Sequence, residues 1–390
     1  MQRLWRILIS SILITLLLWM GLCSPLLAAG GKLETSSVTT SAESAILMDA
    51  NGTILYEKDA HKRLPPASVT KIMTLLLAVE AVEQGKVSLT DEVRISETAW
   101  RQGGSQIWLE PGESMSLKEL MIAIAVVSAN DAAMATMEHI YGSAEAGVQA
   151  MNKRAEELGL VDTHFNSVNG LPTPEHYMSV YDTALIAKEA LRHPLYMEFC
   201  GIKEYWLRGG KNWLVNTNKL LWWYKGADGL KTGWTEEAKY CFAGTAERDG
   251  LRLIAVVFAT PEPRSHLRES MKLMDWGFAN YSALPVVEQG VVVDRLKVNK
   301  GVEQEVQLVA AQDLTLLTAK GKRGNIQKKV NLDPTVNAPV IAGQKYGELI
   351  VTQDGNELGR VDLVAEKTID KASFMRILQG MIVNLFTITS

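Results

Sequence analysis

Residues 65–83 read Pro-Pro-Ala-Ser-Val-Thr-Lys-Ile-Met-Thr-Leu-Leu-Leu-Ala-Val-Glu-Ala-Val-Glu. Proline favours a helix start, and the apolar run after Lys71 predicts a buried helix that ends near Gly85. Ser68 and Lys71 stand three positions apart, so their side chains can meet in the first turn. The backbone N–H groups and helix dipole of that turn favour an oxyanion beside Ser68. A capping role for Ser68 alone would leave Lys71 opposing the dipole for no gain. The pair is therefore a candidate nucleophile and base.

A polar triplet interrupts a second apolar stretch. Residues 120–134 read Leu-Met-Ile-Ala-Ile-Ala-Val-Val-Ser-Ala-Asn-Asp-Ala-Ala-Met. If Ser128, Asn130 and their neighbour Asp131 are buried, they must be hydrogen-bonded, because unpaired burial is costly. These residue types favour caps and turns, so a break between two helices is predicted. The structural alternative is a capping triplet between core helices.

The third motif, Lys231-Thr232-Gly233, lies among predicted strands. Glycines on both sides of the lysine let a substrate backbone approach a sheet edge closely. Apolar runs at 239–246 and 251–259 predict two further strands. Near the start of the chain, Asn51-Gly52 predicts a tight hairpin turn in which both residues adopt positive φ. Strands at both ends of a helical middle predict an α+β domain whose sheet is closed by distant segments.

These three motifs, in this order, resemble those of class A β-lactamases and penicillin-binding proteins. The chain resembles most the low-molecular-mass penicillin-binding proteins, which are serine D-Ala-D-Ala carboxypeptidases of peptidase family S11, and among them the Gram-positive, sporulation-associated branch. The resemblance is strong over about residues 36–283 and looser beyond. Further familial stretches are 103–112, 151–152, 156–160, 163–165, 169–172, 176–177, 181–182 and 216–218.

The resemblance implies a penicillin-binding/β-lactamase-like domain with an antiparallel sheet and a helical subdomain. It implies hydrolysis of peptidoglycan pentapeptide stems through an ester on Ser68, with β-lactams as covalent inhibitors and without a metal or other cofactor. Neutral Lys71 would take the hydroxyl proton, its pKa depressed by burial and by Lys231. Ser128 would relay a proton to the leaving D-alanine, and Asn130 would orient Lys71 and the substrate amide.

The resemblance also implies the groups that bind substrate. Lys231 and Thr232, followed by Gly233, would hold the substrate strand and its carboxylate. The backbone N–H groups of Ser68 and Trp234 would form the oxyanion hole. Arg264 is the candidate for gripping the terminal carboxylate, with Arg268 as its competitor.

Three other kinds of protein could carry motifs of this type. A class A β-lactamase adds a Glu-x-x-Leu-Asn segment for deacylation, which this sequence lacks, and has Ser-Asp-Asn where this chain has Ser-Ala-Asn. A D,D-endopeptidase shares every motif and stays open as an alternative. A non-catalytic wall-binding protein is disfavoured because the motif side chains are intact.

The start of the chain predicts export. A basic segment at 1–6, an apolar core at 7–18 and small residues at 28–30 indicate a secretory signal peptide, residues 1–29, cleaved near Ala29. Cys200 and Cys241 then remain in the mature chain, and two buried thiols are favoured over a disulfide. The net charge of −4 argues against a nucleic-acid partner.

The composition changes after Pro285. Short apolar runs broken by Gly, Asn and Asp predict a small all-β domain at 286–366 without a catalytic constellation. Residues 368–388 predict an amphipathic helix, too polar to span a bilayer but suited to its outer surface. The alternative is a helix packed on its own β domain. Its apolar face would comprise Phe374, Ile377, Leu378, Met381, Ile382, Leu385 and Phe386.

Overall fold

The computed structural model describes residues 38–321 and 325–375 of the chain. Its first part is built on a five-stranded antiparallel sheet in the order β2-β1-β9-β8-β7. Ser44 of β1 lies opposite Phe258 of β9, so distant segments close the sheet, and the predicted α+β class is confirmed. The strands are β1 (Ser44–Asp49), β2 (Ile54–Lys58), β7 (Ala227–Thr235), β8 (Lys239–Arg248) and β9 (Leu251–Thr260).

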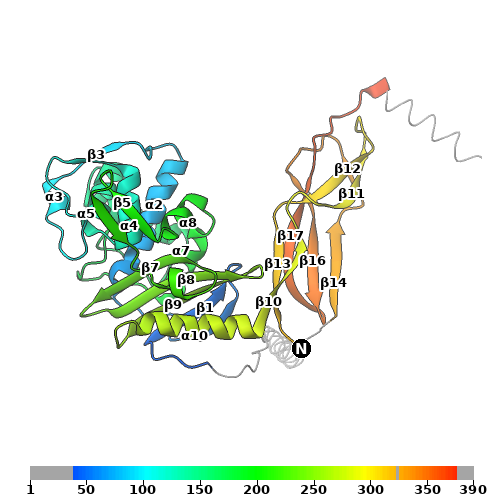
Figure 1. Cartoon of the computed structure of the whole chain (residues 1–390). Helices are drawn as coiled ribbons and strands as arrows, with labels where there is room; N and C mark the ends of the chain where they lie inside the picture. The colour runs from blue at the N-terminus through cyan, green and yellow to red at the C-terminus, as the bar shows by residue number, and fades with distance from the viewer. Residues whose placement is uncertain (1–37, 322–324, 376–390) are drawn as a thin grey trace, which may run out of the picture. The chain divides into compact units, whose positions relative to one another are not determined.

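Helices cover both faces of this sheet. Helix α10 (Ser265–Asn280) runs along one face, and the remaining helices gather on the other side (Figure 1). They are preceded by the 3-10 turn η1 (Ala67–Thr70) and comprise α2 (Lys71–Glu83), α3 (Glu97–Trp100), α4 (Leu117–Val127), α5 (Asn130–Tyr141), α6 (Ala144–Glu157), α7 (Val180–Ala190), α8 (Pro194–Cys200) and α9 (Leu220–Trp223). Two short antiparallel strand pairs accompany the helices: β3 (Glu92–Arg94) with β4 (Ser114–Ser116), and the hairpin of β5 (Glu204–Leu207) with β6 (Asn212–Val215).

Helices α2 and α4 form the centre of the helical part. All side chains of α2 from Lys71 to Val79 are buried, as are those of α4 from Leu120 to Val126. A helix that is apolar on every side gains stability only when it is surrounded by other elements, which explains this central position. Gly85, with φ +68°, follows the end of α2 as predicted.

The first hairpin differs from its prediction in one respect. Gly52 has φ +99°, but Asn51 is not among the residues with positive φ. The predicted two-residue turn, in which both residues have positive φ, is therefore wrong. The Asp49 carboxylate accepts hydrogen bonds from the backbone N–H groups of Asn51 (3.0 Å) and Thr53 (2.7 Å). These bonds stabilise a longer turn, which only one positive-φ residue needs to close.

The regular elements described between Tyr281 and Ala365 are all strands, in agreement with the predicted all-β domain. Strands β10 and β13 pair, and a second sheet has the order β14-β16-β17-β12-β11-β15. A separate apolar core that includes Leu296, Leu308 and Leu363 fills this part. The strands are β10 (Tyr281–Val287), β11 (Val292–Asn299), β12 (Glu305–Ala310), β13 (Leu314–Ala319), β14 (Ile326–Leu332), β15 (Thr335–Asn337), β16 (Lys345–Gln353) and β17 (Asn356–Ala365).

The two predicted terminal segments fall largely outside the described residues. The signal peptide lies wholly outside them, and so does the C-terminal apolar stripe from Ile377 onward. Ile369 and Lys371 form β-bridges with Val340 and Gly301, so the predicted helix does not begin at residue 368. These bridges tie the segment to the β domain. Among the helices of the described residues, none has the length and apolar character needed to cross a bilayer.

Candidate active site

Ser68 and Lys71 meet at the junction of η1 and α2. The side chain of Lys71 is 1% exposed, whereas Ser68 is only partly buried. The Lys71 Nζ lies 3.0 Å from Ser68 Oγ and donates a 2.6 Å hydrogen bond to the carbonyl of Asn169. The predicted contact is therefore confirmed, although Ser68 lies on a 3-10 turn and Lys71 is the first residue of the α-helix.

The surroundings of Lys71 favour its neutral form. Burial, and then the nearby charge of Lys231, hold the pKa of the Lys71 amine well below its ordinary value, against a smaller opposite effect of Asp131. A neutral amine carries a lone pair that can accept the proton of a hydroxyl at hydrogen-bond distance. Lys71 is thus placed and tuned to act as a base toward Ser68.

Strand β7 brings the third motif against the nucleophile. A Cβ atom on Gly233 would lie 2.9 Å from the Pro66 carbonyl oxygen and 3.1 Å from the Ser68 nitrogen. Only glycine permits this close crossing of β7 and η1, and Trp234 follows it directly. Lys231 is buried, donates a 2.8 Å hydrogen bond to the Thr232 carbonyl, and has its pKa lowered to about 7 by burial.

The second motif breaks the α4–α5 pair, as predicted. Ser128 ends α4 in the left-handed conformation, with φ +63°. Among the described residues, its buried hydroxyl and the Asn130 Oδ1 have no hydrogen-bond partner. The Asn130 Nδ2 donates to the Gly103 carbonyl (2.7 Å) and its backbone N–H to the Ser105 carbonyl (2.7 Å). Unpaired buried polar atoms are rare in proteins and are typical of sites that bind a polar ligand.

The sequence did not identify Asp131 as a supporting residue. Its buried carboxylate accepts hydrogen bonds from the backbone N–H groups of Ile107 (3.1 Å) and Leu109 (3.1 Å). These bonds hold the loop whose earlier carbonyls contact Asn130. The sequence did contain an indication of this role. Asp131 directly follows Asn130 in an apolar helix, and a carboxylate buried there must accept hydrogen bonds from several donors.

His176 is hydrogen-bonded to Thr70 in η1, the turn that carries Ser68. The backbone N–H of Asn166 donates to His176 Nδ1 (3.0 Å), so the ring proton lies on Nε2 and is donated to Thr70 Oγ1 (2.8 Å). Thr70 in turn donates to the Ala67 carbonyl (2.8 Å). Burial lowers the pKa of His176 to about 4, so the ring stays neutral. The sequence marked 176–177 only as a familial stretch, without this role.

Of the remaining predicted residues, Thr232 lies on the edge strand β7 and Arg264 lies directly before α10. Thr232 Oγ1 is 2.9 Å from Thr217 Oγ1, in the segment between β6 and α9. Arg264 adopts φ +64° before α10, and its guanidinium lies 5.9 Å from the Trp223 ring centroid. Its competitor Arg268 forms an ion pair with Glu262 (3.1 Å). Arg264 has a strained backbone conformation, and its guanidinium is not engaged by Glu262 as that of Arg268 is. Both features favour Arg264 over Arg268 as the ligand-binding group.

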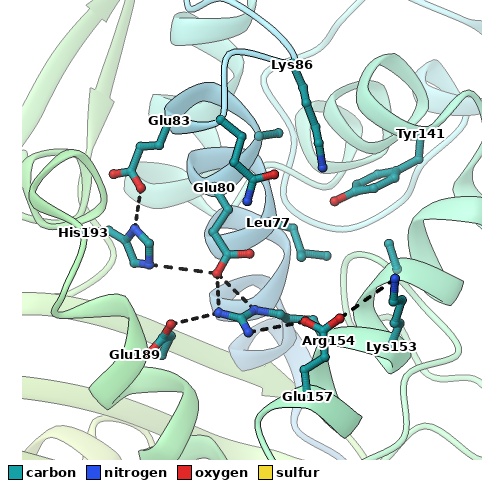
Figure 2. Close-up of a pocket in the computed structure, with 13 residues that line it drawn as sticks. Leu77, Glu80, Glu83, Lys86, Tyr141, Lys153, Arg154, Glu157, Glu189 and His193 are labelled. Atoms are coloured by element: carbon teal, nitrogen blue, oxygen red, sulfur yellow. Dashed lines mark hydrogen bonds and ion pairs between the residues drawn. The ribbon is translucent and has the colours of Figure 1, made fainter. Parts of the chain in front are cut away.

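A second polar cluster lies at the far end of α2. Glu80, Glu189 and His193 bring donor atoms close enough for a metal ion. Figure 2 shows that the Arg154 guanidinium lies among them, 2.7 Å from Glu80 and 2.8 Å from Glu189. His193 is directed to Glu83, at 2.6 Å. Because Arg154 already pairs with both carboxylates, the cluster is an ion-pair network that joins α2, α6 and α7.

Cys200 and Cys241 are buried and unpaired, as predicted. Burial raises the pKa of both Cys200 and Cys241 to about 12. A thiol with so high a pKa is a poor nucleophile. Ser68 is therefore the candidate nucleophile of the site.

Comparisons with known proteins identify relatives of both parts of the chain. The family model for D-alanyl-D-alanine carboxypeptidase matches residues 32–262, and that for the C-terminal domain of penicillin-binding protein 5 matches residues 281–371. D-alanyl-D-alanine carboxypeptidase DacF of Bacillus subtilis is 41% identical over 377 residues, covering 95% of this chain and 97% of the relative.

Solved structures agree with this similarity. Penicillin-binding protein 5 of Haemophilus influenzae superposes with a TM-score of 0.74 at 32% identity, covering 86% of this chain and all of that one. Penicillin-binding protein D2 of Listeria monocytogenes, solved in its ampicillin-bound form, gives a TM-score of 0.58 at 32% identity and covers 62% of this chain and all of that one.

Proposed function

Because this chain belongs to the D-alanyl-D-alanine carboxypeptidase family, peptidase family S11, and is a penicillin-binding serine carboxypeptidase, we propose that its substrates are the pentapeptide stems of peptidoglycan. It removes the terminal D-alanine of each stem through an ester formed on Ser68. The observation that carries this mechanism is the 3.0 Å contact between Ser68 Oγ and Lys71 Nζ, in surroundings that keep the amine neutral. A serine hydroxyl becomes a nucleophile only when an adjacent base can take its proton.

Acylation begins with attack of Ser68 Oγ on the carbonyl carbon of the penultimate D-alanine. Lys71 Nζ takes the hydroxyl proton, and the N–H groups of Ser68 and Trp234 stabilise the oxyanion. The tetrahedral intermediate collapses as the peptide C–N bond breaks, and the proton on Lys71 passes through the Ser128 hydroxyl to the leaving amine, which leaves Lys71 neutral again. The buried, unpartnered hydroxyl of Ser128 is available for that transfer.

Substrate binding uses the edge of the sheet. The extended peptide lies along β7, and Lys231, Thr232 and Arg264 hold its terminal carboxylate. Asn130 Oδ1, which lacks a partner among the described residues, accepts from the substrate amide. Water then attacks the carbonyl carbon of the Ser68 ester, with Lys71 taking a proton from the water. The C–O bond to Ser68 Oγ breaks, Lys71 returns the proton to Ser68, and the shortened stem leaves as a carboxylate.

The segments outside and around this domain complete the proposal. Residues 1–29 direct export, 36–283 form the catalytic domain, and 286–366 form a stem or contact domain. The apolar stripe within 368–388 holds the enzyme on the outer face of the cell membrane. There it trims stem peptides during cell wall biogenesis and contributes to cell shape.

Labelled penicillin tests the nucleophile directly. The label should map to Ser68 by peptide mapping, should be absent from Ser68→Ala, and should persist because the chain lacks the class A deacylating segment. Incubation with diacetyl-Lys-D-Ala-D-Ala should release D-alanine. Labelling of another residue, or rapid turnover of the drug, would contradict the mechanism. A cross-linked muropeptide in the same assay measures any D,D-endopeptidase activity.

A further inference from the structure

The β5–β6 hairpin exposes two large aromatic rings to solvent. Trp206 and Trp213 lie opposite each other in the hairpin, with ring centroids 6.1 Å apart and planes inclined by 20°. They are 59% and 55% exposed, whereas Leu207 and Leu214 on the other face are buried. One face of the hairpin thus packs on α4, and the other presents the paired rings. Exposed apolar surface of this kind indicates an interaction site.

A third exposed ring is held beside the hairpin. Trp108 is 75% exposed and adopts φ +57°, a strained value for a bulky residue. The bonds from Ile107 and Leu109 to Asp131 fix its neighbours on both sides. Arg208, in the hairpin turn, donates to the Trp108 carbonyl at 3.2 Å. Strain maintained by surrounding contacts is typical of functional positions. We call Trp108, Trp206 and Trp213 the tryptophan face.

Both segments that carry the tryptophan face are linked along the chain to residues of the candidate active site. The loop of Trp108 also carries the Gly103 carbonyl, which binds Asn130. Trp213 lies four residues before Thr217, which contacts Thr232. Four residues of extended chain span at most about 14 Å. An extended five-residue stem with its carboxyl end at Thr232 spans about 17 Å, which is long enough to bridge the separation between Thr232 and the hairpin.

We propose that the tryptophan face binds the glycan strand to which the stem peptide is attached. This inference rests on the proposed function, because it takes the stem to be the substrate of the cleft. The N-acetylated sugar rings of the strand have apolar C–H faces that can stack on indole rings, and polar rims that can meet the indole N–H groups. Each enzyme molecule would then recognise the polymer as well as the peptide end.

The charges around the tryptophan face favour an uncharged polymer over an anionic membrane. The Trp213 indole N–H donates to the Glu204 carboxylate at 3.3 Å, and Arg208 pairs with Glu113 at 2.8 Å. Glu110 and Lys211 are the other charged residues of these two segments. Surfaces that bind anionic lipids carry an excess of lysine and arginine, which this face does not.

The test compares two substrates of the full-length enzyme. For Trp206→Ala/Trp213→Ala, kcat/KM on diacetyl-Lys-D-Ala-D-Ala should stay within about twofold of wild type, whereas on uncross-linked glycan strands carrying pentapeptides it should fall about tenfold through KM. The Trp206→Phe/Trp213→Phe variant should restore most of the loss, since it keeps two aromatic faces. Val161→Ala, which trims an exposed apolar side chain elsewhere, should match wild type.

A binding measurement separates this inference from the proposed reaction. Wild-type protein should sediment with peptide-free glycan strands, and Trp206→Ala/Trp213→Ala should not, whether or not the enzyme cleaves either substrate. Equal loss on both substrates would overturn the inference, as would unchanged sedimentation of the double variant. Loss of binding to phosphatidylglycerol vesicles, with glycan binding intact, would also overturn it and assign the face to the membrane. Failure of wild type to release D-alanine from the small peptide would instead refute the proposed function.

Discussion

Replacing Gly233 with alanine tests whether β7 must pass as close to η1, the turn that carries Ser68, as only a residue without a Cβ atom allows. The new methyl carbon would lie 2.9 Å from the Pro66 carbonyl oxygen, 3.0 Å from the Val69 nitrogen and 3.1 Å from the Ser68 nitrogen. All three are backbone atoms, so no flexible side chain can move aside. Relieving the contacts to an ordinary separation of about 3.5 Å requires β7 and η1 to separate by roughly half an ångström.

Two measurable effects follow from that separation. Overpacking of this kind costs about 1–3 kcal/mol of unfolding free energy, which should lower Tm by roughly 2–10 °C. The N–H group of Trp234 would also move away from the Ser68 ester. Since a 1 Å misplacement costs about a hundredfold in rate, half of it should slow acylation by roughly tenfold.

The assay is the second-order rate of Ser68 labelling by a fluorescent penicillin, with Tm measured on the same samples. Gly103→Ala is the matched control, because its methyl group would meet no atom within 4 Å and its φ is ordinary. It should label at the wild-type rate. If Gly233→Ala labels as fast as Gly103→Ala and melts at the same temperature, the close crossing does not matter and the reasoning is refuted.

Four further outcomes are expected. Lys71→Arg keeps the charge but cannot supply a neutral amine, so penicillin labelling should fall to the level of Lys71→Ala; near-wild-type labelling would remove Lys71 from the base role. Lys231 has a pKa near 7, so KM for carboxylate substrates should rise with pH above about 7 as its ammonium is lost, and a KM profile flat to pH 9 would contradict this. Arg154→Met leaves two carboxylates facing each other and should lower the unfolding free energy by about 2–4 kcal/mol in urea titrations, with kcat unchanged. Truncation after Ser373 preserves the β-bridges of the β domain and should abolish membrane pelleting while activity on small peptides persists; pelleting of the truncated protein would exclude the apolar stripe as the anchor.

The sequence predicted those parts of the site that depend on side-chain type and local spacing. Ser68 and Lys71 meet because a three-residue spacing places two side chains on one side of a helical turn. The break at Ser128 follows from polar residues that compete with helix hydrogen bonds. Even so, the turn type was not predictable, because 3-10 and α geometry place residues three apart almost equally well.

The groups that the sequence missed act through the backbone or across long separations. The carbonyl of Asn169 binds Lys71, yet a carbonyl belongs to every residue and leaves no trace in composition. His176 reaches Thr70 across more than a hundred residues. The predicted type of the Asn51-Gly52 turn was wrong for a related reason. The Asp49 carboxylate accepts hydrogen bonds from backbone N–H groups of the turn, and the Asn-Gly pattern does not reveal this partner.

The two buried lysines explain why such a site suits substrates that end in a carboxylate. The charge of Lys231 lowers the pKa of Lys71, because two cations in one buried site repel. The proposed mechanism nevertheless requires a neutral Lys71 amine beside Ser68 and a charged Lys231 beside Thr232. A substrate carboxylate beside Lys231 stabilises the charged form of that lysine, and the positive charge of Lys231 in turn keeps Lys71 neutral. Binding of the correct chain end thus completes the charge arrangement that the reaction needs, and peptides without a free carboxylate would leave it incomplete.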